Sequence, residues 1–76
     1  MDNIVVYSKN NCMQCKMTKR YLSEHNVNFQ EINVSNEPEY IDYLKGLGYQ
    51  SVPVVMQNDN NPIVGFRPDA LKGLVD

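Results

Sequence analysis

The stretch IVVYSKNNCMQCKMTKRYL, Ile4 to Leu22, decides the fold. Within NIVVY at residues 3–7, the run IVVY is continuously apolar and rich in β-branched residues, which predicts a buried strand. Asn10 and Asn11 follow it, and asparagine favours turns and helix starts. From Cys12 to about Glu24 the apolar residues recur at helical spacing. The chain is therefore predicted to pass from a strand into a helix at its first cysteine.

Five further segments continue this pattern toward the C-terminus. NFQEINV at 28–34 alternates and predicts a strand, and SNEPEYIDYLKGLGY at 35–49 predicts a helix. Strands are expected at 51–57 and 63–66, and the turn residues NDNNP between them predict a hairpin. Pro68, with an acid directly after it, is typical of a helix start and opens the last helix.

The sequence also indicates where helices end and which faces they bury. Asn36 and Glu39 have the spacing of a capping box, and Gly48 suits the C-terminal stop of the same helix. The residues expected to face inward are Met17, Tyr21 and Leu22 in the first helix, Tyr40, Ile41, Leu44 and Leu47 in the second, and Ala70, Leu71, Leu74 and Val75 in the third.

The predicted order is β-α-β-α-β-β-α, an α/β fold of one domain that covers residues 1–76. Strands joined through a helix should be parallel with a right-handed crossover, and the last two strands should be antiparallel. We therefore expect a four-stranded mixed sheet flanked by three helices, which cover both of its faces.

The net charge is small, but its distribution is uneven. A formal charge of −2 and a pI of about 5.2 argue against general nucleic-acid binding. Between residues 3 and 23 there is no acidic residue, whereas Lys9, Lys16, Lys19 and Arg20 all fall inside that window. The cysteines thus lie in a cationic segment, for which a solvated helix face is favoured over a dedicated docking patch.

No signal peptide or membrane-spanning segment is indicated, because the run IVVY is too short for either. We expect a cytoplasmic monomer without a membrane or nucleic-acid partner. In a reducing compartment, a Cys-x-x-Cys pair is more often catalytic or metal-binding than structural.

Three chemistries compete for Cys12 and Cys15. As a structural disulfide, closing a loop of about four residues is worth roughly 2 kcal/mol before strain, against about 3 for a loop of ~15. A zinc site needs about four ligands, and His25 is the single histidine. Metal binding would need a second chain or a cofactor, and no metal or bound cofactor is expected. A redox pair is favoured, because a βαβ setting is typical of thioredoxin-like motifs.

Cys12 is the expected nucleophile and Cys15 the expected resolving thiol. A helix N-terminus and neighbouring lysines lower the pKa of a cysteine and so favour its thiolate. Cys15, about one turn further on, should be more buried yet within reach of Cys12. Cys12 would attack a substrate disulfide to give a mixed disulfide, and Cys15 would then attack Cys12 and release the reduced substrate.

Two neighbouring pairs of residues could contact the substrate. Met13 and Gln14 either fill exposed positions at the helix start or tune the thiol and touch the substrate, and the sequence leaves both open. Pro53 cannot donate a ladder hydrogen bond, so Val52-Pro53 could be an ordinary strand entry. If the bond is cis and faces the cysteines, the Val52 main chain could pair with an extended substrate strand.

Three motifs, YSKNNCMQCKMTKRYL, SVPVV and GFRPDAL, resemble those of the glutaredoxin-like proteins known as NrdH-redoxins. The match runs over nearly the whole chain, and CMQC and GFRP are much more specific than a bare Cys-x-x-Cys. The resemblance implies a compact thioredoxin/glutaredoxin-like fold with a redox-active Cys12–Cys15 disulfide. It also implies electron delivery to the large subunit of a class Ib ribonucleotide reductase. Recharging would come from thioredoxin reductase with NADPH, in place of the glutathione that glutaredoxins use.

The resemblance also assigns roles to other residues. It supports the roles given above to the two cysteines, and it makes Val52-Pro53 a cis-proline loop that faces them. Arg67 and Pro68, in the Gly-Phe-Arg-Pro motif, would help fix the loop before the last helix. A surface ion pair with Asp69 is the alternative for Arg67.

Two departures from the family pattern keep rival functions open. Ile63-Val64 stand where many relatives carry Trp-Ser, which removes an aromatic residue from this edge. Phe66 follows Gly65 where glutathione-binding glutaredoxins have a second glycine, although Lys9 and Asp69 still resemble parts of a glutathione site. A glutathione-dependent glutaredoxin is therefore the nearest rival. A metal or iron–sulfur carrier that bridges two chains is the rival from another class.

Overall fold

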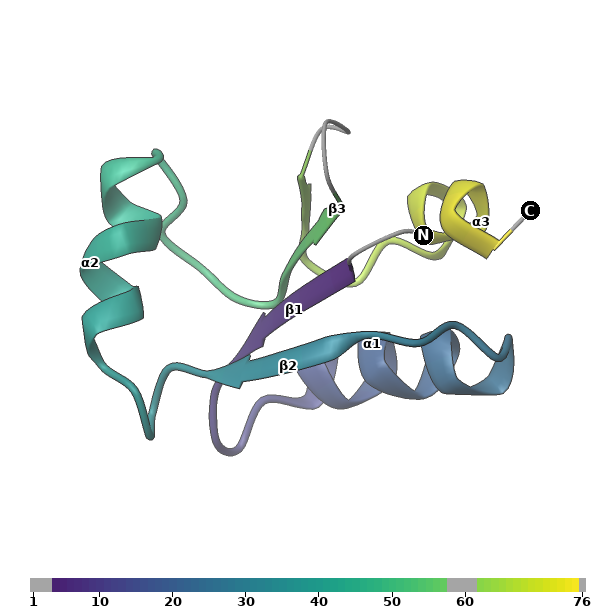
Figure 1. The fold of residues 1–76 in the computed structure, drawn as a ribbon, viewed down its shortest axis with the longest axis horizontal. Helices are drawn as coiled ribbons and strands as arrows, with labels where there is room; N and C mark the ends of the chain where they lie inside the picture. The colour runs from purple at the N-terminus through teal and green to yellow at the C-terminus, as the bar shows by residue number, and fades with distance from the viewer. Residues whose placement is uncertain (1–3, 58–61, 76) are drawn as a thin grey trace.

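The computed structural model describes residues 4–57 and 62–75 and contains four strands and three helices there. In chain order the elements are β1 (Ile4–Ser8), α1 (Met13–Glu24), β2 (Gln30–Asn33), α2 (Glu39–Gly46), β3 (Val54–Gln57), β4 (Ile63–Val64) and α3 (Pro68–Val75) (Figure 1). The predicted order β-α-β-α-β-β-α is confirmed. None of the helices in the described ranges has the length and hydropathy needed to cross a membrane.

The four strands form one mixed sheet in the order β2-β1-β3-β4. β1 is parallel to β2 and antiparallel to β3, with Tyr7 opposite Ile32 on one side and opposite Val54 on the other. β3 and β4 are antiparallel, as predicted for a hairpin. Because β1 ends beside the beginning of β3, the segment after β1 and the segment before β3 leave the sheet at the same end.

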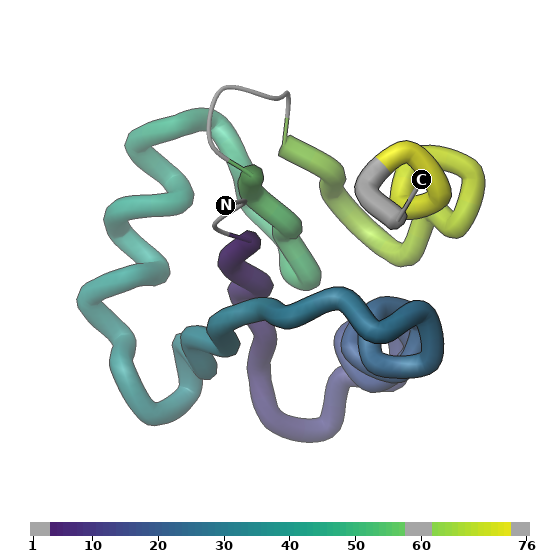
Figure 2. Tube along the Cα trace, turned by 45° about the vertical axis from the view of Figure 1, so that its right-hand side comes forward, coloured from purple at the N-terminus to yellow at the C-terminus, as the bar shows by residue number. Residues whose placement is uncertain are grey.

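Helices cover both faces of this sheet (Figure 1). α1 and α3 lie side by side on one face, and α2 lies alone on the other; Figure 2 shows the strands between them. Successive residues of a strand point to opposite faces. The central strand β1 therefore contributes side chains to two separate cores.

The core beneath α1 and α3 is closed and apolar. Its buried residues, each at most 4% exposed, are Ile4, Val6, Leu22, Val55 and Leu71. Leu22 comes from α1 and Leu71 from α3, and both are fully buried. Full burial of one leucine stabilises the fold by about 1.5–3 kcal/mol, so these two side chains hold their helices firmly against the sheet.

The core beneath α2 is aromatic and less completely covered. Its buried residues are Tyr7, Val34, Leu44 and Val54. The Tyr7 ring lies 5.8 Å from that of Tyr40 and 6.1 Å from that of Tyr43. Burial raises the pKa of the Tyr7 hydroxyl, and Tyr43 and Tyr40 add to the effect. Ile41, predicted to face inward, is 38% exposed.

The inward face of α1 differs from the predicted one. Cys15, Thr18 and Leu22 are buried and Tyr21 is half-buried, but Met17 is 41% exposed. At roughly 100° per residue, Met17 lies about 200° around the helix from Cys15. The prediction for Met17 is therefore wrong, because the second cysteine and not the methionine sets the buried side.

The predicted capping box at the start of the second helix is also wrong. α2 begins at Glu39, and Pro38 before it makes no capping hydrogen bond with its side chain. The main-chain N–H groups of Asn36 and Glu37 instead donate to Asn33 O at 3.1 and 3.0 Å. A turn that follows β2 thus occupies the segment where the cap was expected.

The predicted helix stop at Gly48 is confirmed. Gly48 has φ +95°, in the left-handed region that favours glycine. Its N–H donates to Lys45 O at 3.0 Å, and the Tyr49 N–H donates to Leu44 O at 2.9 Å, which together form a Schellman motif. Since α2 ends at Gly46, Leu47 lies beyond it and is 49% exposed, contrary to its predicted inward position.

The strands are shorter than the sequence predicted. β3 begins at Val54 and not at residue 51, and β4 ends at Val64 because Gly65 turns the chain with φ +81°. The NDNNP turn lies almost wholly outside the described residues. The side chains of Leu74 and Val75 also lie outside the described part of the chain.

Candidate active site

The turn between β1 and Cys12 is tied to the loop that follows β2. The Asn10 N–H donates to Ser35 Oγ at 3.1 Å, and Asn33 Nδ2 donates to Asn10 Oδ1 at 3.0 Å. The Ser35 N–H donates in turn to Asn33 Oδ1 at 2.8 Å. Asn11 has φ 58°, a conformation that asparagine adopts more readily than most residues. These contacts fix the point at which α1 begins.

Cys12 directly precedes α1 and Cys15 lies one turn into it, as predicted. The Cys12 main chain is extended, with φ −113° and ψ 106°, and its Sγ accepts a hydrogen bond from the Cys15 N–H at 3.1 Å. The two residues form a disulfide, with Cα atoms 5.2 Å apart. Cys12 is 8% exposed and Cys15 only 1%, so Cys12 is the more accessible of the two residues.

Reduction of this disulfide leaves the Cys12 sulfur where a thiolate is stabilised. The first turn of a helix has unpaired N–H groups, and its dipole favours negative charge there. The Cys15 N–H already points at Cys12 Sγ. The sulfur of Cys12 thus occupies the position of an N-terminal capping group.

The cationic segment divides into two parts. Lys19 Nζ lies 2.6 Å from a carboxylate oxygen of Glu31, and Arg20 is paired within α1. Lys19 and Arg20 therefore form ion pairs on the helix surface, and pairs at or near the surface contribute little to stability. Lys9 and Lys16 are exposed and lie nearer to Cys12 in the sequence.

The three sequence motifs meet beside the cysteines. The Val52-Pro53 bond is cis, as expected, and Pro53 is buried. Pro53 O accepts a hydrogen bond from the Gly65 N–H at 2.8 Å. A Cβ placed on Gly65 would lie 3.6 Å from Gln14 Oε1, so the Gln14 side chain lies over this turn. The loop before β3 and the turn after β4 are therefore neighbours of the CMQC helix start.

Two of the residues predicted to contact the substrate, Val52 and Met13, have groups that the described part of the chain leaves unoccupied. Among residues 4–57 and 62–75, the Val52 main chain makes no hydrogen bond. An unpaired main chain of this kind can accept an added strand. Met13 is 69% exposed at the start of α1. Substrate contact is thus geometrically open to Val52 and Met13, whereas Gln14 also contacts the Gly65 turn.

The GFRP motif holds the chain between β4 and α3. Phe66 packs against the core beneath α1 and α3, with its ring 6.5 Å from that of Tyr21. Pro68 is the first residue of α3, and the Arg67 main-chain oxygen accepts two N–H groups from its first turn. Arg67 Nη2 lies 3.8 Å from Asp69 Oδ2, and both side chains are largely exposed. The Arg67 side chain therefore forms the surface ion pair, and its main chain holds the helix start.

A polar cluster behind the cysteine helix was missed by sequence reasoning. Ser8 Oγ and Lys19 Nζ both donate to Glu31 Oε2 at 2.6 Å, which joins β1, α1 and β2. The Lys19 ammonium, and then the Ser8 hydroxyl, lower the pKa of the Glu31 carboxyl. Ser8 is buried and needs such a partner, but nothing local in the sequence indicates a contact 23 residues away.

His25 does not join the cysteines. It is exposed at the C-terminal end of α1, with its ring 4.4 Å from that of Tyr21. Within the described ranges, no three Cys, His, Asp or Glu side chains are grouped as they would be around a metal ion. His25 is thus an exposed residue at the end of α1.

Exchange between thiols and disulfides needs one sulfur that can be reached and a second that can displace the product. Cys12 and Cys15 meet this need, because Cys12 keeps a small exposed area at a helix N-terminus and Cys15 lies almost wholly buried beside it. The fold and the site together define a thiol–disulfide oxidoreductase.

The comparisons with known proteins identify the family. The Glutaredoxin family model matches residues 4–61. The chain is 46% identical to the glutaredoxin-like protein NrdH of Lactococcus lactis subsp. cremoris, over 93% of this chain and 97% of that protein. It is 38% identical to the NrdH of Escherichia coli K12, over 93% of this chain and 86% of that protein. The chain belongs to the NrdH-redoxins of the glutaredoxin family.

Solved structures agree with this assignment. The NrdH-redoxin of Escherichia coli superposes with a TM-score of 0.89 at 38% identity, covering 95% of this chain and 93% of that one. A glutaredoxin of Archaeoglobus fulgidus reaches a TM-score of 0.83 at 27% identity, covering 99% and 87%. The predicted thioredoxin/glutaredoxin-like fold is thus confirmed.

Proposed function

We propose that this redoxin donates electrons to the large subunit of a class Ib ribonucleotide reductase and is recharged by thioredoxin reductase with NADPH. The observation that carries the proposal is a reachable Cys12 within CMQC, in a chain related to NrdH proteins along nearly its whole length. Such a donor serves deoxyribonucleotide synthesis under reducing conditions. We therefore place it in the cytoplasm, as a monomer.

The proposed exchange proceeds through a mixed disulfide. The Cys12 thiolate attacks one sulfur of the substrate, the substrate S–S bond breaks, and the released thiolate takes up a proton. Cys15 then loses its proton and attacks Cys12 Sγ, which closes the Cys12–Cys15 disulfide and frees the second substrate thiol. Two electrons pass to the substrate, with one proton from Cys15 and one from solvent. NADPH then returns two electrons and one proton as a hydride through the reductase, and water supplies the second proton.

Two considerations support thioredoxin reductase over glutathione as the electron source. The Escherichia coli NrdH-redoxin is described as having a thioredoxin-like activity profile. A small tripeptide needs several contacts at once, because it has few atoms with which to offset its lost freedom. Phe66 stands where a second glycine would let the glutathione main chain approach. Since its ring packs against the core, Phe66→Gly would also remove core packing, so the wild-type protein is the one to test.

The electron source is tested by mixing oxidised protein with each reducing system separately. Thioredoxin reductase with NADPH is expected to recycle the protein rapidly, and glutathione with glutathione reductase slowly or not at all. NADPH consumption is followed while a disulfide substrate is present. Turnover with glutathione and none with thioredoxin reductase would move the chain to the glutathione-dependent glutaredoxins.

The electron acceptor is tested by trapping. Cys15→Ser protein, mixed with the oxidised large subunit of a class Ib reductase, is expected to accumulate a mixed disulfide through Cys12. Cys12→Ser serves as the matched control and should form none. If no adduct forms with the reductase subunit while other disulfides are still attacked, the reductase is not the electron acceptor. The assignment as a thiol–disulfide oxidoreductase would then remain.

A glutathione-dependent glutaredoxin is the second candidate. It is favoured by the match to the Glutaredoxin family model and by the exposed Lys9, which could meet one carboxylate of the tripeptide. The recycling experiment separates the two candidates directly.

A further inference from the structure

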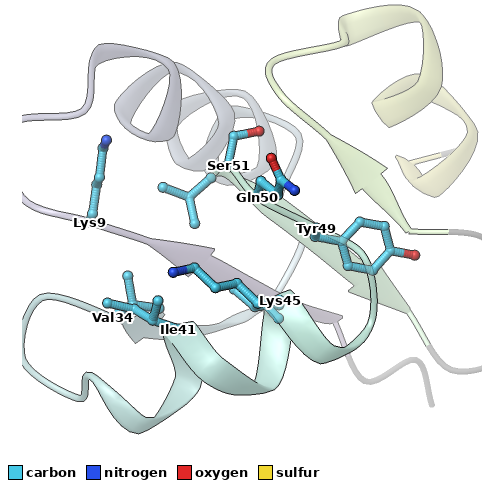
Figure 3. Close-up of a pocket in the computed structure, with 9 residues that line it drawn as sticks. Lys9, Val34, Ile41, Lys45, Tyr49, Gln50 and Ser51 are labelled. Carbon is cyan, nitrogen blue, oxygen red and sulfur yellow. The ribbon is translucent and has the colours of Figure 1, made fainter.

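A pocket opens on the α2 face of the sheet (Figure 3). Its volume is about 170 Å³. Apolar side chains from three segments form its floor, and two lysines stand at its rim. The lining residues include Val34, Ile41, Leu44 and Val52 in the floor, and Lys9 and Lys45 at the rim.

The pocket lies at the end of the sheet where the cysteines are held. Ser8, the last residue of β1, pairs with Asn33, and Tyr7 pairs with Val54. The segments that follow β1 and β2 and the segment that precedes β3 therefore leave the sheet together. Those segments carry Lys9 and Val52, and Cys12 follows Lys9 by three residues. Because Val52 precedes the cis-proline and Lys9 lies three residues before Cys12, the pocket lies next to the segments that carry the redox site.

The charge at the rim is uncompensated. Within the described part of the chain, neither Lys9 nor Lys45 has an ion-pair partner, whereas Lys19, Arg20 and Arg67 each have one. Figure 3 shows both lysine ammonium groups toward the end of the pocket away from the Tyr49 ring. The whole chain has a formal net charge of −2, whereas this rim carries two positive charges without an ion-pair partner in the described residues.

The size of the pocket limits what it can hold. Sites for small-molecule ligands measure roughly 300–1,000 Å³, so a volume of about 170 Å³ suits a side chain and not a whole cofactor. Aliphatic walls beneath two free ammonium groups suit an apolar side chain with a carboxylate next to it. The unpaired Val52 main chain offers an edge along which an extended segment can lie.

We propose that this pocket receives the segment of the substrate protein that adjoins its disulfide, with an aliphatic side chain in the floor and an acidic residue at Lys9 and Lys45. The inference rests on the proposed reduction of protein disulfides. It adds a substrate preference: disulfides flanked by aliphatic and acidic residues are reduced faster than those flanked by aliphatic and neutral ones.

Two synthetic peptides test the preference. Each contains one internal disulfide, followed by Leu-Glu-Glu in one and by Leu-Gln-Gln in the other. Pre-reduced protein is mixed with each peptide in a single turnover, quenched with acid, and the reduced peptide is measured by chromatography. No reductase is present, so the result is independent of the electron source. The acidic peptide is expected to react about 5–10 times faster at low salt, and salt should weaken the difference.

Lys45→Glu and Lys72→Glu form a matched pair of variants. Each replaces an exposed lysine in the last turn of its helix, but Lys72 lies on α3, on the opposite face. Lys45→Glu should abolish or reverse the preference for the acidic peptide, and Lys72→Glu should leave it unchanged. Replacing the peptide leucine with serine should slow the wild-type reaction about 3-fold.

Several outcomes overturn the inference. Equal rates for both peptides, or the same preference in Lys45→Glu as in wild type, mean that the pocket does not select substrates. Inhibition by S-methylglutathione, which cannot exchange disulfides, would assign the pocket to glutathione. If hydroxyethyl disulfide is reduced but neither peptide is, the inference about the pocket fails and the oxidoreductase activity remains. If no disulfide is reduced, the proposed function fails with it.

Discussion

The two faces of the sheet are built for different tasks. Beneath α1 and α3, five apolar side chains are almost fully excluded from water, and they come from two strands and two helices. Beneath α2, that helix supplies one buried side chain, Leu44, while Ile41 and Tyr43 of the helix and Leu47 just after it remain well exposed. The pocket opens on the second face.

The difference shows how a chain of 76 residues combines a closely packed support for its cysteines with a more open face that carries the proposed recognition pocket. Cys15 is buried on the same side of α1 as Leu22, so the closed face fixes the cysteines. Lys9 and Val52, which leave the sheet toward the other face, are half-buried or exposed and free to meet another molecule. The positioning of the cysteines and the proposed binding of the substrate thus depend on opposite sides of one sheet.

The largest effect is expected at the cysteines. Cys12→Ser should reduce disulfide turnover to the level measured without protein, because the reachable nucleophile is gone. In the Cys15→Ser protein, Cys12 should still attack the substrate disulfide, but the resulting mixed disulfide should not be resolved. Mass spectrometry after mixing with a disulfide peptide detects the adduct. Brief alkylation of the reduced wild-type protein should label Cys12 first, and preferential labelling of Cys15 would reverse the two roles.

Core truncation compares the two faces directly. Leu22→Ala on the closed face should lower the free energy of unfolding by about 3–5 kcal/mol, and Leu44→Ala on the α2 face by about 2–3. Leu44 already lines an open pocket, so truncation there leaves less new empty space. Urea unfolding of the oxidised proteins gives both values. A cost at Leu44 as large as that at Leu22 would mean that the α2 face is equally closed.

A smaller effect is expected at Glu31, whose pKa is lowered by Lys19 and then by Ser8. The pKa of Glu31 is lower in the folded protein than in the unfolded chain. The ionised carboxylate therefore stabilises the protein at pH values above the ordinary pKa range of glutamate. That stability is lost as the pH falls through the lowered pKa. Glu31→Gln should therefore cost less than about 1 kcal/mol at neutral pH, since the pair is partly exposed.

The pH dependence separates this interaction from a general charge effect. The difference between wild type and Glu31→Gln should vanish in acid, as the wild-type carboxyl becomes protonated. Glu24→Gln is the control, because its partner Arg20 is 3.3 Å away and both side chains are largely exposed. It should change stability less than Glu31→Gln does. A difference at Glu31 that persists at low pH would argue against the ionic account.

Sequence reasoning succeeded where the signals were local. The helix start at Cys12 and the stop at Gly48 were predicted correctly, because both depend on residues within one or two turns. It failed at Met17, where a helical spacing of apolar residues did not reveal which side the sheet would cover. It also failed at Asn36, whose N–H is taken by Asn33 in a turn that the capping pattern does not encode.

The site was likewise only partly predictable. The cysteine pair, and the predicted roles of Cys12 as nucleophile and Cys15 as resolving thiol, follow from the CMQC spacing at a helix start. The cis geometry of Val52-Pro53 came from resemblance to a family and not from any local cue. The pocket rim formed by Lys9 and Lys45 was not predicted. These residues are 36 positions apart in the sequence, and only the folded chain places both beside one pocket.

By itself, the sequence determined the types and order of the elements and the placement of two sulfurs one helical turn apart, because periodicity and end signals act over a few residues. The tertiary structure alone decided that Gln14, Pro53 and Gly65 are neighbours, and that Glu31 joins Ser8 to Lys19. These contacts depend on the strand order β2-β1-β3-β4, which brings distant segments to one end of the sheet. That order is set by how two cores are buried at once, and no short stretch of the chain contains that information.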